Sequence, residues 1–155
     1  MVLSEICMLE PVSCTAHTTA LEAAYTMRQK HVGALVVVDD GEERAAPIGL
    51  ITDRDIVVEV LAKGLDPAVT LVGSLIRTPV VIANGGMDSS HALELMKSHG
   101  VRRLPVVSSA GVLMGIITVD DLLRQVAAEA NSLIEIISRE QAHEQRGRRA
   151  ATGAA

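Results

Sequence analysis

Two stretches of the sequence decide the fold: Gly49–Val57, which reads GLITDRDIV, and Gly115–Leu123, which reads GIITVDDLL. Both follow the pattern Gly-apolar-apolar-Thr-x-x-Asp, and the second lies 66 residues after the first. The apolar run before the Thr is typical of a buried strand. Thr followed by acidic residues is typical of a helix start, because its hydroxyl and the first-turn carboxylates stabilise the free N–H groups there. Each stretch therefore predicts a strand that passes directly into a helix.

The residues before these stretches also repeat. Pro11 and Val12 recur 68 residues later, and Met27 and the Val-rich run 34–38 recur 69 residues later. The offset changes only where a polar loop has a different length, as expected for a structural duplication. We therefore expect an α/β (α+β) fold of two units, each with the order strand–helix–strand–strand–helix. The first unit would span residues 1–66 and the second residues 67–128.

The composition limits the functions that this chain can have. Of its 155 residues 48% are hydrophobic, yet Tyr25 is the only aromatic residue and the net charge is −5. A chain with no basic excess and no aromatic stacking platform is a poor candidate for binding nucleic acid. Neither a leader peptide nor an apolar run of membrane-spanning length is visible, so we expect a cytoplasmic protein without a membrane partner. No catalytic motif is present, and we expect no enzyme.

The duplicated pattern resembles a tandem pair of CBS domains, also called a Bateman module, and is similar to small stand-alone bacterial CBS-pair proteins. The resemblance rests on the two stretches quoted above and on His99–Val107, HGVRRLPVV, and it covers roughly residues 3–126. It implies two βαββα units packed around a pseudo-two-fold axis. It also implies clefts that bind adenosine-containing ligands such as AMP, ADP, ATP or S-adenosylmethionine, and association of two pairs into a dimer.

The resemblance further implies which residues contact such a ligand. Hydrogen bonds to ribose or phosphate would come from Thr52 with Asp55 and from Thr118 with Asp121. The base would lie near Cys14, Ile82, Val32, Ala34 and Val101, and the candidate phosphate contacts are Arg54, His99, Arg102 and Arg103. The physical chemistry agrees, because a carboxylate can accept two hydrogen bonds from a cis-diol and a helix N-terminus offers N–H groups to phosphate.

Three functions stay open on the sequence alone. The first is a homodimeric sensor that binds an adenosine-containing ligand and passes a conformational change to an unknown effector protein. The second is a protein–protein interaction scaffold with vestigial nucleotide sites. The third is a metal- or redox-responsive variant that uses Cys7, Cys14 and His17, but three groups are too few for a closed zinc site. We expect no metal and no required cofactor.

An amphipathic helix is predicted after the second unit. Apolar residues spaced by three and four positions run from Val126 to Ile137, and the helix is expected to continue to about Glu144. Residues 129–155 would thus form a helical extension that ends, from Arg146, in a disordered tail. The apolar stripe could contact a second copy, dock a partner or fold back on its own pair, and we expect self-association.

Overall fold

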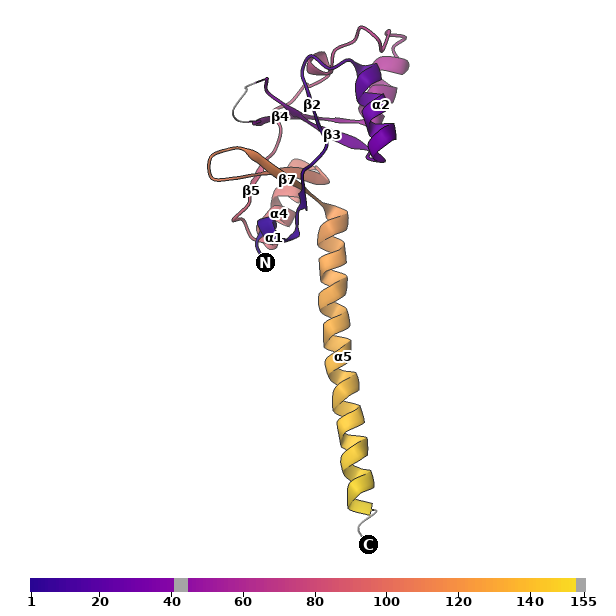
Figure 1. Cartoon of the computed structure of the whole chain (residues 1–155), viewed down its shortest axis with the longest axis vertical. Helices are drawn as coiled ribbons and strands as arrows, with labels where there is room; N and C mark the ends of the chain where they lie inside the picture. The colour runs from indigo at the N-terminus through magenta and orange to yellow at the C-terminus, as the bar shows by residue number, and fades with distance from the viewer. Residues whose placement is uncertain (41–44, 153–155) are drawn as a thin grey trace. The chain divides into compact units, whose positions relative to one another are not determined.

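The computed structural model describes residues 1–40 and 45–152, which fall into two compact units, Met1–Val119 and Asp120–Ala155. Within the first unit, the strands and helices of the two halves of the repeat can be followed in Figure 1. In the first half these are, in chain order, β2 (Ser13–Thr15), α2 (Ala20–Lys30), β3 (Ala34–Val38) and β4 (Pro47–Thr52). In the second half they are β5 (Ala83–Asn84), α4 (Ser89–His99), β6 (Arg103–Val107) and β7 (Leu113–Thr118).

The two halves share the same strand pairing. In each, the short first strand pairs parallel with the Val-rich strand, which pairs antiparallel with the strand of the Gly-x-x-Thr pattern. The register shifts between Val37 and Val38 in the first half and between Val106 and Val107, the equivalent positions, in the second. A shared irregularity of this kind confirms the duplication and the predicted α/β class.

Capping residues mark the ends of the helices between the strands. Thr19 and Glu22 form a capping box at the start of α2, where the Glu22 carboxylate accepts from the Thr19 backbone N–H at 2.8 Å. Asp88 is the N-cap of α4 and accepts from the Ser90 backbone N–H at 3.0 Å. α4 ends at Gly100 in the left-handed conformation, which Gly adopts without steric cost.

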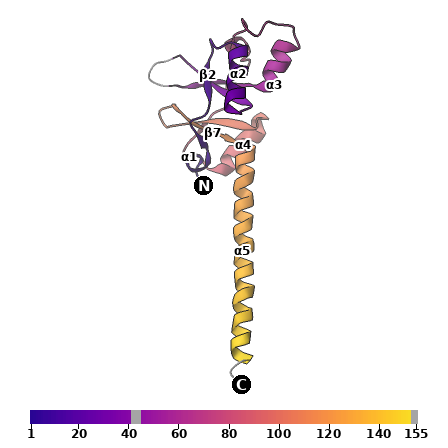
Figure 2. The ribbon, with the colours of Figure 1, turned by 45° about the vertical axis from the view of Figure 1, so that its right-hand side comes forward.

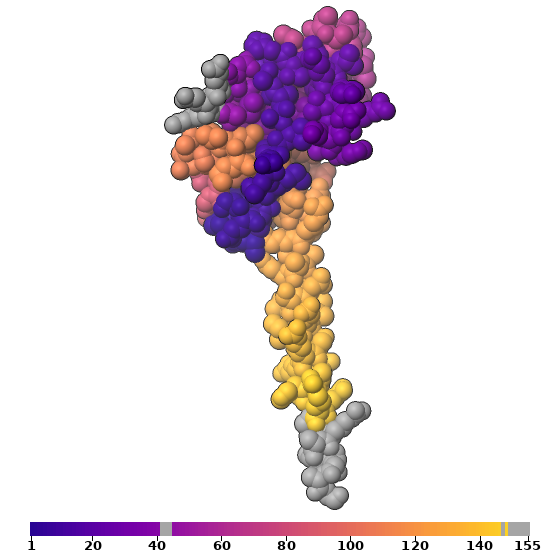
Figure 3. Space-filling model, viewed as in Figure 1, coloured from indigo at the N-terminus to yellow at the C-terminus, as the bar shows by residue number. Residues whose placement is uncertain are grey.

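The segment that precedes each half packs on the other half. Residues 1–9, which include α1 (Leu3–Ile6) and β1 (Met8–Leu9), join the second half, where β1 pairs antiparallel with β7. The second sheet therefore has the order β1-β7-β6-β5, whereas the first has only β2-β3-β4. Figures 2 and 3 show these indigo residues against the orange segment that contains β7. We call residues 1–9 and 70–78 the lead-in segments.

The hydrogen bonds of the two lead-in segments match at the repeat offset of 69 residues. The backbone N–H of Leu3 donates to Met87 O at 2.9 Å, and that of Val72 donates to Thr18 O at 2.8 Å. Ser4 with Gly85 and Gly73 with Ala16 form the next equivalent pair, both at 2.9 Å. The duplication thus includes segments whose side chains show no similarity. The sequence did not predict this exchange, and residues 1–9, expected in the first unit, complete the second sheet.

The core is aliphatic, as the composition predicts. In the first half it contains Ala23, Met27, Leu35, Val37, Ile51, Ile56 and Val72. Val72 comes from η2 (Val72–Ser74) of the second lead-in segment, so the exchange also fills the core. The first half ends in α3 (Asp53–Ile56), which continues as the π-helix η1 (Val57–Leu61).

The second compact unit is the long helix α5 (Val119–Thr152), which starts directly after β7. It runs further than the expected end near Glu144, and the residues from Arg146, expected to be disordered, are helical as far as Thr152. Pairs such as Glu135 with Arg139 and Glu144 with Arg148, each at 3.8 Å, stabilise the polar part of this helix. Residues 153–155 lie outside the described part of the chain. No described helix is both long and apolar enough to cross a membrane.

Candidate ligand-binding site

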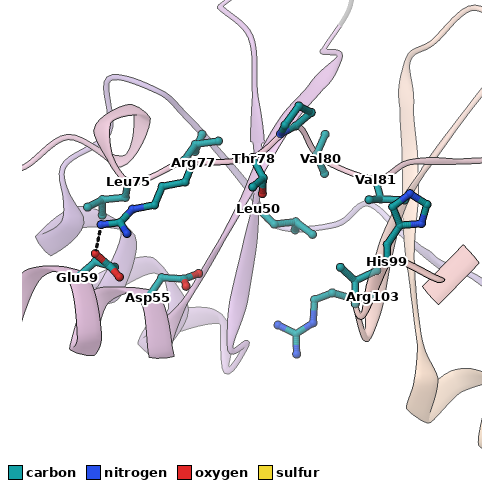
Figure 4. A pocket seen from close by; sticks show the side chains of 13 residues that line it. Leu50, Asp55, Glu59, Leu75, Arg77, Thr78, Val80, Val81, His99 and Arg103 are labelled. Carbon is teal, nitrogen blue, oxygen red and sulfur yellow. Dashed lines mark hydrogen bonds and ion pairs between the residues drawn. The ribbon is translucent and has the colours of Figure 1, made fainter. Parts of the chain in front are cut away.

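A cavity of about 470 Å³ lies between the two halves of the first unit. This volume falls in the range of roughly 300–1,000 Å³ that is usual for small-molecule sites. Figure 4 shows Asp55, Glu59 and Arg77 on one side of the cavity and His99 and Arg103 on the other. The remaining lining is mostly apolar and comes from β4, from the chain between η2 and β5, and from the start of the second Val-rich segment: Leu50, Leu75, Ile76, Thr78, Pro79, Val80, Val81 and Val101.

Asp55 is held in place by the start of α3. Thr52 is the N-cap, and its hydroxyl accepts from the Asp55 backbone N–H at 3.1 Å. In return, Oδ2 of Asp55 accepts from the Thr52 backbone N–H at 2.8 Å and from its hydroxyl at 2.7 Å. Oδ1 of Asp55 has no hydrogen-bond partner among the described residues. A fixed carboxylate with one unused oxygen can accept hydrogen bonds from the hydroxyl groups of a ligand.

Two arginines line the cavity in different states. Arg77 pairs with Glu59, which also accepts from Lys63 Nζ at 2.5 Å. These contacts, the Lys63 hydrogen bond foremost, hold the pKa of Glu59 below its ordinary value. Arg103 makes no hydrogen bond or ion pair with any residue in the described ranges. Arg103 is therefore the cation that an anionic ligand group would meet without first breaking an internal pair.

His99 lines the same cavity at the end of α4. Its Nδ1 lies 3.0 Å from both Leu95 O and Ser98 Oγ, which turns Nε2 away from the helix. His99 thus offers one ring nitrogen to a ligand. The side chain is exposed, so it adds a polar edge to the cavity and does not close it.

A second cavity, of about 170 Å³, is the repeat counterpart of the first. Pro11, Val12, Val32 and Ile116 line it where Pro79, Val80, Val101 and Leu50 line the larger one. The position equivalent to Arg103 is Ala34, although Arg103 itself also reaches this cavity, together with Thr118. None of the residues of the first unit that line the smaller cavity is a carboxylate, and its volume is below the usual range for a ligand site.

The structure brings together part of the predicted site. Asp55, His99, Val101 and Arg103 line the larger cavity, Thr52 orients Asp55, and Val32, Ala34 and Thr118 line the smaller one. Asp121 lies in the first turn of α5, in the second compact unit, where Arg124 Nη1 donates to it at 3.1 Å. Four predicted residues line neither cavity: Cys14, Arg54, Ile82 and Arg102.

These four lie elsewhere for simple reasons. The side chains of Arg54, Ile82 and Arg102 point to solvent. Cys14 packs against the core of the first half. Burial raises the pKa of its thiol to about 11, because the effect of burial exceeds that of the hydrogen bond with Thr18, which lowers the pKa. Sequence reasoning missed Glu59 and Arg77. Arg77 belongs to a lead-in segment. These segments are equivalent in their backbone hydrogen bonds but not in their side chains, so the repeat in the sequence gave no signal for Arg77.

The metal alternative has no support in the part of the chain that the structure describes. There, no three or more His, Cys, Asp or Glu side chains come close enough to hold an ion. Cys7 is buried and Cys14 is half-buried.

Comparison with known proteins identifies the family. The family model described as "CBS domain" matches residues 3–62 and 72–128. The chain is 38% identical over 127 residues to the CBS domain-containing protein YhcV of Bacillus subtilis, which covers 81% of this chain and 86% of YhcV. It is 37% identical over 120 residues to hypoxic response protein 1 of Mycobacterium tuberculosis, covering 77% of this chain and 81% of that protein. It spans only 61% of a similar uncharacterized protein of Methanopyrus kandleri.

Solved structures agree with this assignment. The crystal structure of hypoxic response protein I, with two coordinated zinc ions, aligns with a TM-score of 0.70 at 34% identity over 80% of this chain and 98% of that one. A CBS domain protein of Pyrobaculum aerophilum complexed with AMP aligns with a TM-score of 0.70 at 25% identity over 83% of this chain and 99% of that one. The chain therefore belongs to the CBS domain family and carries two CBS domains in tandem.

Proposed function

We propose that this protein is a regulatory module that binds one adenosine-containing nucleotide per chain in the larger cavity. The observation that carries the proposal is that Oδ1 of Asp55 and the Arg103 guanidinium line one cavity from opposite sides (Figure 4), and that neither has a partner in the described part of the chain. A ligand with hydroxyl groups at one end of a sugar and an anionic group at the other would satisfy both. The AMP complex of the Pyrobaculum aerophilum relative supports this class of ligand.

Each part of a nucleotide has a matching surface in the cavity. The ribose hydroxyls would donate to Asp55, and the phosphate would accept from Arg103 in a charge-assisted hydrogen bond. The adenine would lie on aliphatic groups such as Leu50, Val80 and Val101. It cannot stack on an aromatic ring of the same chain, because Tyr25 is the only aromatic residue and lies exposed on α2.

Binding at this place would couple the two CBS domains. Asp55 belongs to the first domain and Arg103 to the second, so one ligand contacts both. A ligand that bridges two domains favours the arrangement in which both contacts form, and this shifts the population of conformers. An effector protein that distinguishes these arrangements would read the signal. We propose no catalysis, since no described lining residue pairs a nucleophile with a base.

Calorimetry with AMP, ADP, ATP and S-adenosylmethionine tests the proposal, with two matched pairs of variants. Arg103→Ala should weaken binding of the preferred nucleotide by about 10- to 150-fold, the usual effect of losing a hydrogen bond to a charged group. Arg102→Ala, at the exposed neighbouring position, should leave binding unchanged. Asp55→Asn should weaken binding, whereas Asp53→Asn, on the same helix but outside the cavity lining, should not.

Two results would contradict the proposal. One is the absence of any heat or thermal shift with all four ligands at millimolar concentration, which would favour an interaction scaffold with vestigial sites. The other is equal binding by the Arg103→Ala and Arg102→Ala proteins. A fitted stoichiometry of one ligand per chain is expected, because the smaller cavity, of about 170 Å³, lies below the usual volume of a ligand site.

A further inference from the structure

The larger cavity holds an ion pair that the nucleotide contacts proposed above do not use. Glu59 and Arg77 both line the cavity, and the Arg77 guanidinium pairs with the Glu59 carboxylate, as the dashed line in Figure 4 marks. Only 21% of the Glu59 side chain is exposed, against 64% for Arg77. A second carboxylate in a cavity that takes an anionic ligand repels that ligand, and a repulsive group of this kind can select between ligands.

The local structure fixes the Glu59 carboxylate and keeps it charged. Glu59 lies in the π-helix η1 (Val57–Leu61), and π-helical turns are rare and frequently occur at functional sites. Lys63 Nζ, which lies outside the cavity lining, donates to the same carboxylate at 2.5 Å. The hydrogen bond from Lys63 and the charge of Arg77 hold the pKa of Glu59 below its ordinary value, so the carboxylate is ionised at neutral pH.

The ion pair is particular to this cavity. At the repeat offsets of 66 and 69 residues, the counterparts of Glu59 and Arg77 are Gln125 and Met8. Neither counterpart is charged. The fold that the two halves share therefore does not need an ion pair at these positions, which points to a role in the larger cavity itself.

The pair also divides the two guanidinium groups of the cavity. Arg103 has no partner among the described residues, whereas Arg77 is held by Glu59. One phosphate group can bind Arg103 without breaking an internal pair. A second or third phosphate needs a further cation, and Arg77 becomes available only when it leaves Glu59. The Glu59 carboxylate would then face the added phosphates and repel them.

Glu59 lies close to the place proposed for the ribose. It follows Asp55 by four residues, and helical residues at this spacing share a face, with Cβ atoms roughly 5–6 Å apart. A phosphate chain that leaves a ribose held by Asp55 thus has Glu59 within reach. We propose that Glu59 is a specificity-determining residue that restricts the cavity to nucleosides with a single phosphate, because it engages Arg77 and repels further phosphate groups. This inference rests on the nucleotide site proposed above and states which ligands of that class the site selects.

Calorimetry with AMP and ATP, in the absence of divalent cations, tests the inference. The unsubstituted protein should bind AMP more tightly than ATP by about tenfold or more. Glu59→Gln keeps the shape of the side chain and removes its charge, so it should reduce this preference by about fivefold or more. Glu94→Gln is the matched control, because Glu94 pairs with Lys97 at 3.8 Å on α4 and lies outside the cavity lining. The same loss of charge there should leave the preference unchanged.

A second substitution separates the release of Arg77 from the loss of repulsion. In the Glu59→Gln protein Arg77 no longer has a carboxylate partner in the cavity, so adding Arg77→Gln should remove most of the gain in ATP affinity. Thermal melts establish that each variant is folded. The preference of the unsubstituted protein for AMP requires no variant and is a test in its own right.

Four results would overturn the inference and leave the nucleotide site in place. They are equal affinity of the unsubstituted protein for AMP and ATP, an unchanged preference in Glu59→Gln, the same change in Glu94→Gln, and an undiminished gain in the double variant. In each case Arg103→Ala would still weaken binding. No binding of either nucleotide would refute the inference together with the proposed site.

Discussion

The two glycines of the repeated pattern, Gly49 and Gly115, should respond very differently to the same substitution. A Cβ at Gly115 would lie 2.7 Å from the backbone oxygen of Met8 and 2.7 Å from Cys7 Sγ. A Cβ at Gly49 would lie 2.6 Å from Ile76 Cδ1, the end of a half-buried side chain. A side chain can rotate away, whereas Met8 is fixed by the pairing of β1 with β7.

The expected magnitudes follow from these contacts. Overpacking costs about 1–3 kcal/mol, and replacing Gly in a strand recovers about 0.5–1 kcal/mol of chain entropy. Gly115→Ala should therefore lower the free energy of unfolding by about 1–2 kcal/mol, or the melting temperature by about 2–8 °C. Gly49→Ala should be close to neutral, because movement of Ile76 offsets most of the clash.

Urea denaturation at one protein concentration would compare the two variants. Adding Cys7→Ala to Gly115→Ala removes the sulfur contact but leaves the Met8 oxygen in place, so it should not restore stability. The reasoning would be refuted if Gly115→Ala lost no more stability than Gly49→Ala, or if Cys7→Ala rescued it fully. Either result would mean that the backbone of the first lead-in segment does not pack as closely against Gly115 of β7 as the distance to Met8 O indicates.

Three further predictions concern single residues. His31 and Gly100 occupy equivalent left-handed positions, with φ of 54° and 65°. In thermal melts, His31→Gly should therefore stabilise the protein by about 1 kcal/mol, and Gly100→Ala should destabilise it by a similar amount. A less stable His31→Gly protein or a more stable Gly100→Ala protein would contradict this. Thr19→Ala removes the capping box of α2 and should cost about 0.5–2 kcal/mol in urea denaturation, while Ser13→Ala, in the exposed first position of β2, should cost little. Because burial raises the pKa of Cys14 from 9.0 to about 11, its thiolate fraction at pH 8 is about 100-fold lower than in the unfolded chain, and iodoacetamide should label it correspondingly more slowly without urea than with it. The unfolded chain loses this proton first, so stability should fall as the pH rises from about 9 towards 11, and Cys14→Ser should lack this part of the decline. Rapid labelling in the folded state would contradict the burial.

Local sequence chemistry determined much of this protein. The Thr-x-x-Asp pattern predicted the cap at Thr52, and the offset of 69 residues predicted two equivalent halves. These features depend on neighbours within a few residues, or on a repeat that is visible directly in the letters. The resemblance to CBS pairs named Asp55 and Arg103 among the candidate ligand contacts, and in the structure both line the larger cavity.

Only the tertiary structure decided which segments complete each half. The lead-in segments exchange places through backbone hydrogen bonds, such as those from Leu3 to Met87 and from Val72 to Thr18, and backbone bonding leaves little trace in side-chain identity. The same exchange brings Arg77 to Glu59, and Arg103 has no partner among the residues that the structure describes; no spacing rule could reveal either fact. The structure also continues α5 past Arg146 to Thr152, although the sequence there has no apolar stripe that would indicate a helix.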